Sequence, residues 1–200
     1  GIILYVTFGP GSTRVFFMEG VKHILGGYDH ILFVIAIHLI VRNIVRVFKI
    51  ITAFTLAHSV TLMLTALGWI NVPGKLVESA IAATIFIMAL ENIHALIRGE
   101  KFASEFKWRW GLTAGFGLIH GMGFAGYLKQ LFLENQNQLL PSIVGFNLGV
   151  EAGQFVIICG LLPVLWLLGK NKKWDKYFSI MASIGIGIVA LVWFMGRLGA

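Results

Sequence analysis

The stretch that decides the fold and the site reads His23-Ile-Leu-Gly-Gly-Tyr-Asp29-His30, and it stands at the start of a long apolar run. Such a run enters the bilayer, where imidazole and carboxylate groups are costly and mark a functional site. On a continuous helix, His23 and His30 lie on one face, about two turns apart. Gly26 and Gly27, between them, leave room for another backbone or an ion to come close.

The composition of the whole chain predicts a membrane protein. Of its 200 residues, 58% are hydrophobic and only 12% are charged, whereas soluble domains carry about 25% charged residues. A soluble protein this apolar would expose too much hydrophobic surface, so we expect a polytopic membrane protein. The formal net charge of +7 does not indicate nucleic-acid binding, because the basic residues fall in short loops between apolar runs.

Six apolar stretches are each long enough to cross about 30 Å of hydrocarbon. We expect these spans at residues 22–41, 48–68, 75–98, 109–128, 140–169 and 177–198. The predicted fold class is therefore an all-α membrane protein, a compact bundle of six transmembrane helices. It divides into an extracytoplasmic or interfacial N-terminal segment (1–21) and the transmembrane domain (22–200).

The basic residues predict how the bundle is oriented. Most of the 16 lysines and arginines flank the first, third and fifth loops, at Arg42, Arg46, Lys49, Arg98, Lys101, Lys107, Arg109, Lys170, Lys172, Lys173 and Lys176. By the positive-inside rule these loops are cytoplasmic, which places both termini outside. For most of these charges, solvated loops in contact with lipid headgroups are a sufficient explanation.

Ionisable residues inside the spans predict a buried polar centre. Four of them lie at similar depth in four different spans, namely His30, His58, His120 and Glu151. His23 and Glu78 stand nearer the outer ends of their spans. Glu91 and His94, three residues apart on one helical face, form a Glu-x-x-His pair of the kind that presents two metal ligands in helical bundles. Together these residues trace a column from one side of the membrane to the other.

The side chains of this column suit a metal ion. Imidazole and carboxylate groups bind zinc, nickel, iron, cobalt or manganese. Cys159 is the only cysteine and no methionine-rich path accompanies the histidines, which argues against copper(I). The alternative for each residue is structural, with the histidines bonded to neighbouring helices and the carboxylates paired with each other or with a histidine. For His38, which lies off the His23/His30 face, the structural role is preferred.

The opening stretch resembles the His-x-x-x-Gly-x-Asp-His signature of the HupE/UreJ family of small bacterial membrane proteins. Three further stretches, at 54–62, 117–125 and 146–154, support the resemblance, which covers about residues 20–168. Ile24 stands where the family usually has proline, which places the chain in a divergent branch. The resemblance implies a nickel or cobalt permease associated with hydrogenase or urease maturation, with metal contacts at His23, Asp29 and His30.

We therefore predict a multi-pass transporter of a divalent transition metal, nickel or cobalt, in the bacterial cytoplasmic (inner) membrane. The predicted metal-binding residues are His23, Asp29, His30, His58, His120, Glu151, Glu91 and His94. The expected partners are the lipid bilayer and the metal ion, with no nucleic acid, and a homo-oligomer is compatible with the sequence. Ions would be captured by His23 and Glu78 and released past Glu91 and His94.

Two other functions compete with transport. An intramembrane zinc hydrolase, acting on a lipid or a membrane-borne substrate, would use the same ligands, with Glu151 or Glu91 as the general base. Haem could instead be ligated by two of His30, His58 and His120. A transporter is preferred over an enzyme.

Overall fold

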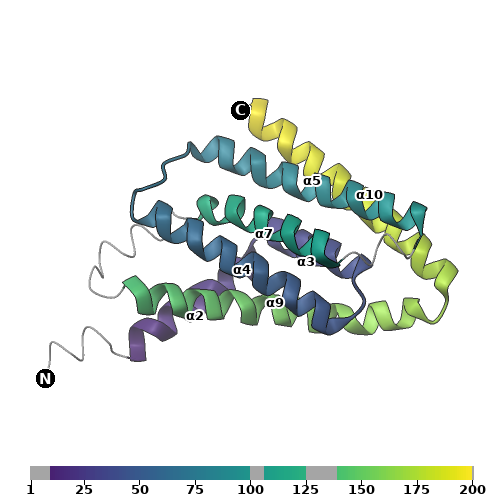
Figure 1. Ribbon diagram of the computed structural model, residues 1–200, viewed down its shortest axis with the longest axis horizontal. Helices are drawn as coiled ribbons and strands as arrows, with labels where there is room; N and C mark the ends of the chain where they lie inside the picture. The colour runs from purple at the N-terminus through teal and green to yellow at the C-terminus, as the bar shows by residue number, and fades with distance from the viewer. Residues whose placement is uncertain (1–9, 100–105, 125–138, 200) are drawn as a thin grey trace, which may run out of the picture.

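The computed structural model describes residues 10–99, 106–124 and 139–199, and no strand occurs in these segments. The chain there forms helices α2 (Pro10–Gly26), α3 (Tyr28–Ile40), α4 (Ile44–Ala66), α5 (Gly74–Arg98), α7 (Phe106–Gly123), α9 (Leu139–Gly169) and α10 (Lys172–Gly199) (Figure 1). The expected all-helical architecture is therefore confirmed for the described part of the chain. The predicted division between residues 21 and 22 falls inside α2, and it stays a prediction.

Four of these helices, α4, α5, α9 and α10, are long and apolar enough to cross a membrane. Helices α2 and α3 pass the same test only as a pair, bent by 71°. The described residues thus hold four candidate spans, or five if the bent pair counts as one. The expected span at 109–128 coincides in part with α7, and its last residues lie outside the described chain. Six spans, with both termini outside, remain a prediction.

The expected continuous span at 22–41 is wrong, because the helix breaks at Gly27. This residue has φ −87° and ψ 100°, which is extended rather than helical backbone. Two consecutive glycines make the break inexpensive, since glycine is about 1 kcal/mol less favourable than alanine within a helix. Helix α3 has 13 residues, so it is about 20 Å long and too short to cross the hydrocarbon alone.

The helices associate as three close pairs, α2 with α9, α4 with α7, and α5 with α10 (Figure 1). Small residues bring the first two pairs together. A Cβ added at Gly149 of α9 would meet the carbonyl oxygen of Phe17 in α2. In α7, a Cβ at Gly121 would likewise meet the carbonyl oxygen of His58 in α4.

The outer faces of the bundle carry large hydrophobic side chains. On α9 and α10 the most exposed of them include Trp166, Leu167, Trp174, Met181, Val192 and Met195. Inside the bundle, Phe33, Phe54, Phe146 and Met88 are almost completely buried. An apolar core enclosed by an equally apolar surface is what lipid, rather than water, accommodates.

Candidate metal centre

Three histidines from three helices converge on one point. His23 lies in the last turn of α2, His30 in the first turn of α3, and His58 in the middle of α4. Each offers one ring nitrogen, and these three atoms lie within 4.8 Å of one another. Among the described residues, no other histidine, cysteine or carboxylate belongs to this group.

The break at Gly27 is what brings His23 and His30 together. On a continuous helix, residues seven apart are separated by about 10 Å along the axis. In the bent pair, the ring centroids of His23 and His30 are 4.5 Å apart. The expectation that His23 stands two turns outward as a separate entrance ligand is therefore wrong, and both histidines belong to the same cluster.

Asp29 fixes the orientation of His30. Its Oδ1 accepts a hydrogen bond from the His30 backbone N–H and lies 2.9 Å from His30 Nδ1. Because an ionised carboxylate only accepts, Nδ1 carries the hydrogen and Nε2 keeps its lone pair. A carboxylate on the far nitrogen of a ligating histidine is the usual outer partner in metal sites. This geometry gives Asp29 an orienting contact with His30, and its predicted role as a direct ligand stays a prediction.

Gly27 is needed at the site itself as well as at the bend. A Cβ at this position would lie 2.7 Å from His30 Nδ1 and 2.9 Å from Asp29 Oδ1. Any side chain there would displace the Asp29–His30 pair. The adjacent Gly26 has open space around it. The two glycines therefore do different work, and only the second is required by the centre.

His120, on α7, forms a further wall of the centre. Its ring centroid is 5.4 Å from that of His30. The hydroxyl of Thr84 donates to the carbonyl of Ile81 and lies 2.9 Å from His120 Nε2. Since the hydroxyl hydrogen is already used, Nε2–H of His120 donates to Thr84 and Nδ1 keeps the lone pair. Thr84 was not predicted; the only signal was a hydroxyl in the apolar run of the third span.

Five buried ring nitrogens of these four histidines have no hydrogen-bond partner in the described part of the protein. They are His23 Nε2, His30 Nε2, His58 Nδ1, His58 Nε2 and His120 Nδ1. Buried polar atoms are nearly always hydrogen-bonded, so a group of orphaned atoms needs an explanation. Nitrogen lone pairs gathered around one point suit a divalent transition metal such as nickel, cobalt or zinc. Aromatic rings pack against the histidines. The ring centroid of Phe124 is 4.0 Å from that of His23, and the ring centroid of Phe54 is 5.1 Å from that of His120.

Glu151, the fourth residue expected at this depth, is not part of the three-histidine group. It lies half-buried on α9, between Gly149 and Gly153, which pack against α2. Its neighbour in the predicted polar stripe, Gln154, is buried and accepts a hydrogen bond from Thr55 of α4 at 3.1 Å. The similar depth of Glu151 in its span therefore did not place it among the histidines.

Glu91 has a partner that was not predicted. It forms an ion pair with Arg109 of α7, whose side chain is 3% exposed. Arg109 Nη1 also donates to Asn92 Oδ1 at 3.0 Å, and Asn92 Nδ2 donates to the carbonyl of Ala36 at 2.7 Å. This network joins α3, α5 and α7, while His94 lies exposed. Arg109 had been read as a loop cation; its place between Trp108 and Trp110 at the start of an apolar run was the available signal.

Asp29 connects the centre with the surface. Together with Tyr28, Trp193 and Arg197 it lines a cleft of about 300 Å³. Arg197 in turn donates to the Glu78 carbonyl at 2.8 Å and lies 3.7 Å from its carboxylate. Glu78, which was expected as an entrance residue, does not line the cleft but contacts Arg197, which does. Asp29 thus lines this cleft and contacts His30 of the histidine group.

The chain matches a known protein family. The family described as HupE / UreJ protein matches residues 8–197, nearly the whole chain. The chain therefore belongs to this family, as the resemblance of the His23–His30 stretch indicated. Comparison with curated proteins and with solved structures gave no match.

Proposed function

We propose that this member of the HupE/UreJ family carries a divalent transition metal, nickel or cobalt, across the bacterial cytoplasmic membrane. The observation that supports this most strongly is the convergence of ring nitrogens from α2, α3 and α4, with the His120 ring of α7 beside that of His30. Imidazole is the ligand type that these metals share, and a site made largely of neutral donors holds the ion without trapping it as several carboxylates would. The ion is the cargo in this proposal.

The cleft at Asp29 supplies the way in. A hydrated cation is attracted by the carboxylate, which is 21% exposed and hydrogen-bonded to His30. From there the ion passes to the ring nitrogens of His30, His23 and His58, with His120 beside them. The aromatic rings of Phe54 and Phe124 limit the water that can follow. Asp29 thereby both receives the ion and keeps His30 in the tautomer that binds it.

The break at Gly27 supplies a way to release the ion. His23 and His30 stand on two helices joined by a single non-helical residue. A change in the angle between α2 and α3 would separate their ring nitrogens and weaken the site. Hinges of this kind, a few residues that absorb a backbone change, are common in proteins that open and close around a ligand. Release of the ion past Glu91 and His94 requires that the ion pair between Glu91 and Arg109 first opens.

The geometry supports transport better than hydrolysis. The hydrolase required a carboxylate, Glu151 or Glu91, beside the metal as general base. Glu91 is held by Arg109, and Glu151 lies outside the histidine group. We therefore retain the transporter as the proposed function.

Uptake of nickel or cobalt into proteoliposomes tests this function. His30→Ala and His120→Ala are expected to abolish or strongly reduce uptake. His38→Gln serves as the control, because His38 lies in the last turn of α3, at the other end of that helix from His30. Unchanged uptake in both alanine variants would contradict the proposal, as would a single zinc ion that stays bound through purification while no ion crosses the membrane.

A further inference from the structure

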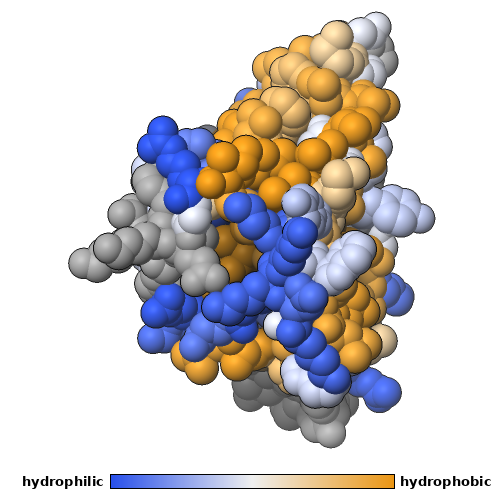
Figure 2. All heavy atoms as spheres, turned by 90° about the vertical axis from the view of Figure 1, so that its right-hand side faces the viewer, coloured by the Kyte–Doolittle hydropathy of each residue, from blue (hydrophilic) through white to orange (hydrophobic). Residues whose placement is uncertain are grey.

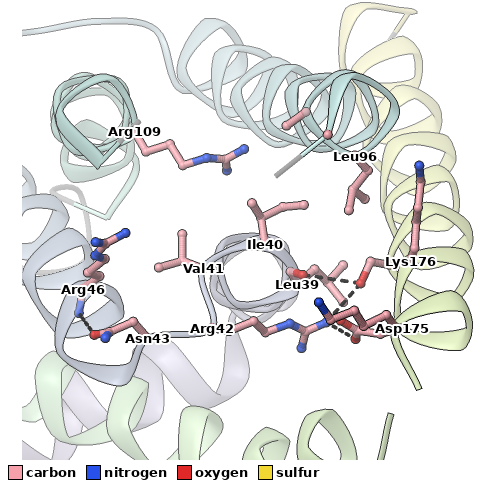
Figure 3. A pocket seen from close by; sticks show the side chains of 14 residues that line it. Leu39, Ile40, Val41, Arg42, Asn43, Arg46, Leu96, Arg109, Asp175 and Lys176 are labelled. Atoms are coloured by element: carbon pink, nitrogen blue, oxygen red, sulfur yellow. Dashed lines mark hydrogen bonds and ion pairs between the residues drawn. The ribbon is translucent and has the colours of Figure 1, made fainter. Parts of the chain in front are cut away.

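A second cavity lies at the end of the bundle where three basic segments meet. It has a volume of about 480 Å³. Its walls come from the α3–α4 connection, the end of α5 and the starts of α7 and α10 (Figure 3). Seen from that end, hydrophilic side chains lie beside and below a hollow with a hydrophobic floor (Figure 2). The cavity is separate from the histidine cluster, and none of the histidines lines it.

The cavity is rich in positive charge. Its basic lining residues are Arg42, Arg46, Arg109, Lys172 and Lys176, against one acidic residue, Asp175. That carboxylate is already paired with Arg42. Across the segments that the structure describes, no ion pair engages Arg46, Lys172 or Lys176. The cavity therefore presents an excess of cations that its own acidic residue does not neutralise.

Arg109 provides a second, independent sign of a ligand. Its guanidinium extends into the cavity (Figure 3), although the residue is only 2% exposed. Its Nη2 forms the ion pair with Glu91, and its Nη1 donates a hydrogen bond to Asn92. Its Nε is buried and has no hydrogen-bond partner in the described residues. A buried charged donor left without an acceptor is costly, so an anion in the cavity would satisfy it.

A large part of the remaining lining is apolar, which limits the kinds of anion that fit the cavity. Leu39, Ile40, Val41 and Leu96 stand beside the cationic groups (Figure 3). A free, fully hydrated phosphate gains nothing from such side chains. An amphiphile, with a phosphate attached to a glycerol and acyl chains, contacts both kinds of surface. Basic pockets between transmembrane helices are typical binding sites for anionic lipid headgroups.

We propose that this cavity binds the phosphodiester headgroup of an anionic phospholipid. Arg46, Lys172 and Lys176 contact the phosphate oxygens from α4 and α10, and Arg109 donates from the inner wall. The glycerol and the first acyl carbons lie against Ile40 and Leu96. Arginine suits this role because its planar group donates to phosphate in a fixed geometry.

Lipid in this cavity would also brace α3. The carbonyl of Leu39 accepts from Ser179 of α10 at 3.3 Å, and that of Ala36 accepts from Asn92 at 2.7 Å. Both contacts hold the end of α3, the helix that begins with Asp29 and His30. A headgroup that binds Arg109 and Lys176 at once would tie α7 to α10 across this end.

The test compares lipid binding by purified full-length protein in detergent. Native mass spectrometry and thermal unfolding are measured with phosphatidylglycerol, with phosphatidylcholine of the same acyl chains, and with soluble glycerol 1-phosphate. The wild type is expected to prefer phosphatidylglycerol. In Lys172→Gln/Lys176→Gln its affinity falls by roughly 10- to 30-fold, as the loss of two basic contacts predicts. The matched control, Lys170→Gln/Lys173→Gln, removes two charges from the same region but none from the lining, and keeps the preference.

Arg46→Gln provides a second variant on another helix, with Lys49→Gln as its control. Equal losses in lining and control variants would overturn the proposal, because they would show a general effect of surface charge. Equal binding of glycerol 1-phosphate and phosphatidylglycerol would also overturn it, because the acyl chains would then contribute nothing. Metal binding at the histidines is expected to stay unchanged in these variants, so this proposal and the proposed function fail independently.

Discussion

The protein has two buried polar centres that look alike in sequence and differ in structure. The histidine cluster gathers His23, His30, His58 and His120, whose facing nitrogens have no protein partner within the described chain. The second centre gathers Glu91, Asn92 and Arg109, which bond to one another and to the backbone of α3, although Arg109 Nε has no partner in the described chain. From the sequence, Glu91 was expected in the same metal pathway as the histidines, whereas Arg109 was expected in a loop.

The difference shows what separates a ligand site from structural polarity inside a membrane. Burial and ionisable chemistry are common to both centres. Only the histidine cluster has lone pairs that converge without acceptors or donors of their own. A structural network stabilises by satisfying its members, whereas a binding site keeps the cost of unsatisfied atoms until the ligand arrives. Substitutions should therefore separate the two centres, affecting binding in the first and stability in the second.

The largest effect is expected from His58→Ala. Both ring nitrogens of His58 are buried and unpaired, so its removal breaks no hydrogen bond but deletes a ligand. Nickel or cobalt affinity should fall by more than about 100-fold, since even outer partners of ligands are worth 10- to 100-fold. Isothermal titration calorimetry measures the affinity and thermal unfolding the stability. If His58→Ala lowered the unfolding temperature but left the metal affinity unchanged, the contrast between the two centres would be wrong.

Arg109→Met should lower the stability of the protein and leave its metal affinity nearly unchanged. It leaves the Glu91 carboxylate partly buried without its cation, and breaking a buried pair costs about 3 kcal/mol. Metal affinity of the folded protein should change by less than about twofold, because Arg109 does not touch the histidines. Denaturant unfolding measures the loss. The double variant Glu91→Leu/Arg109→Met should recover most of it, and failure to recover would show that the pair is not the cause.

Asp29→Asn tests whether the carboxylate beside the histidine cluster contributes to metal affinity. The amide keeps the shape but weakens the hold on Nδ1–H of His30, so metal affinity should fall by 10- to 100-fold. Unfolding should change little, because the side chain is 21% exposed. Calorimetry of Asp29→Glu provides the companion measurement, since this variant keeps the charge and alters its reach. If Asp29→Asn binds as well as wild type, the carboxylate does not orient the ligand.

The smallest effect is expected from Gly27→Ala. The added methyl would crowd His30 Nδ1 and Asp29 Oδ1, 2.7 and 2.9 Å away, and the shift should reduce metal affinity roughly tenfold. Gly26→Ala is the matched control, because nothing lies within 4 Å of its added Cβ. Equal effects of the two substitutions in a binding titration would show that the bend, rather than the contact, is what matters.

Much of the fold was predictable because hydrophobicity and length are local properties. The expected span at 75–98 differs from α5 by one residue, and the span at 140–169 from α9 by one. The break at Gly27 was not predictable in the same way. A Gly-Gly pair is compatible with a continuous helix and with a bend, and the packing of α2 along α9 selects between them.

Within the site, residue types were easier to predict than partnerships. His23, His30, His58 and His120 were each identified as polar groups in apolar surroundings. Depth along a span correctly suggested that His30, His58 and His120 lie close together. The same argument failed for Glu151, because depth says nothing about the face of a helix that points inward. Glu91 was expected to bind metal, and its pairing with Arg109 depends on how α5 and α7 lie together.

The sequence by itself determined that this is an apolar, helical protein of the HupE/UreJ family with histidines and acids in its apolar runs. Composition, run length and a short signature suffice for that, since each is read along the chain. The tertiary structure alone decided which of those groups remain free to bind an ion. That choice depends on a bend at Gly27 and on close helix contacts at Gly121 and Gly149, which bring together residues far apart in the chain.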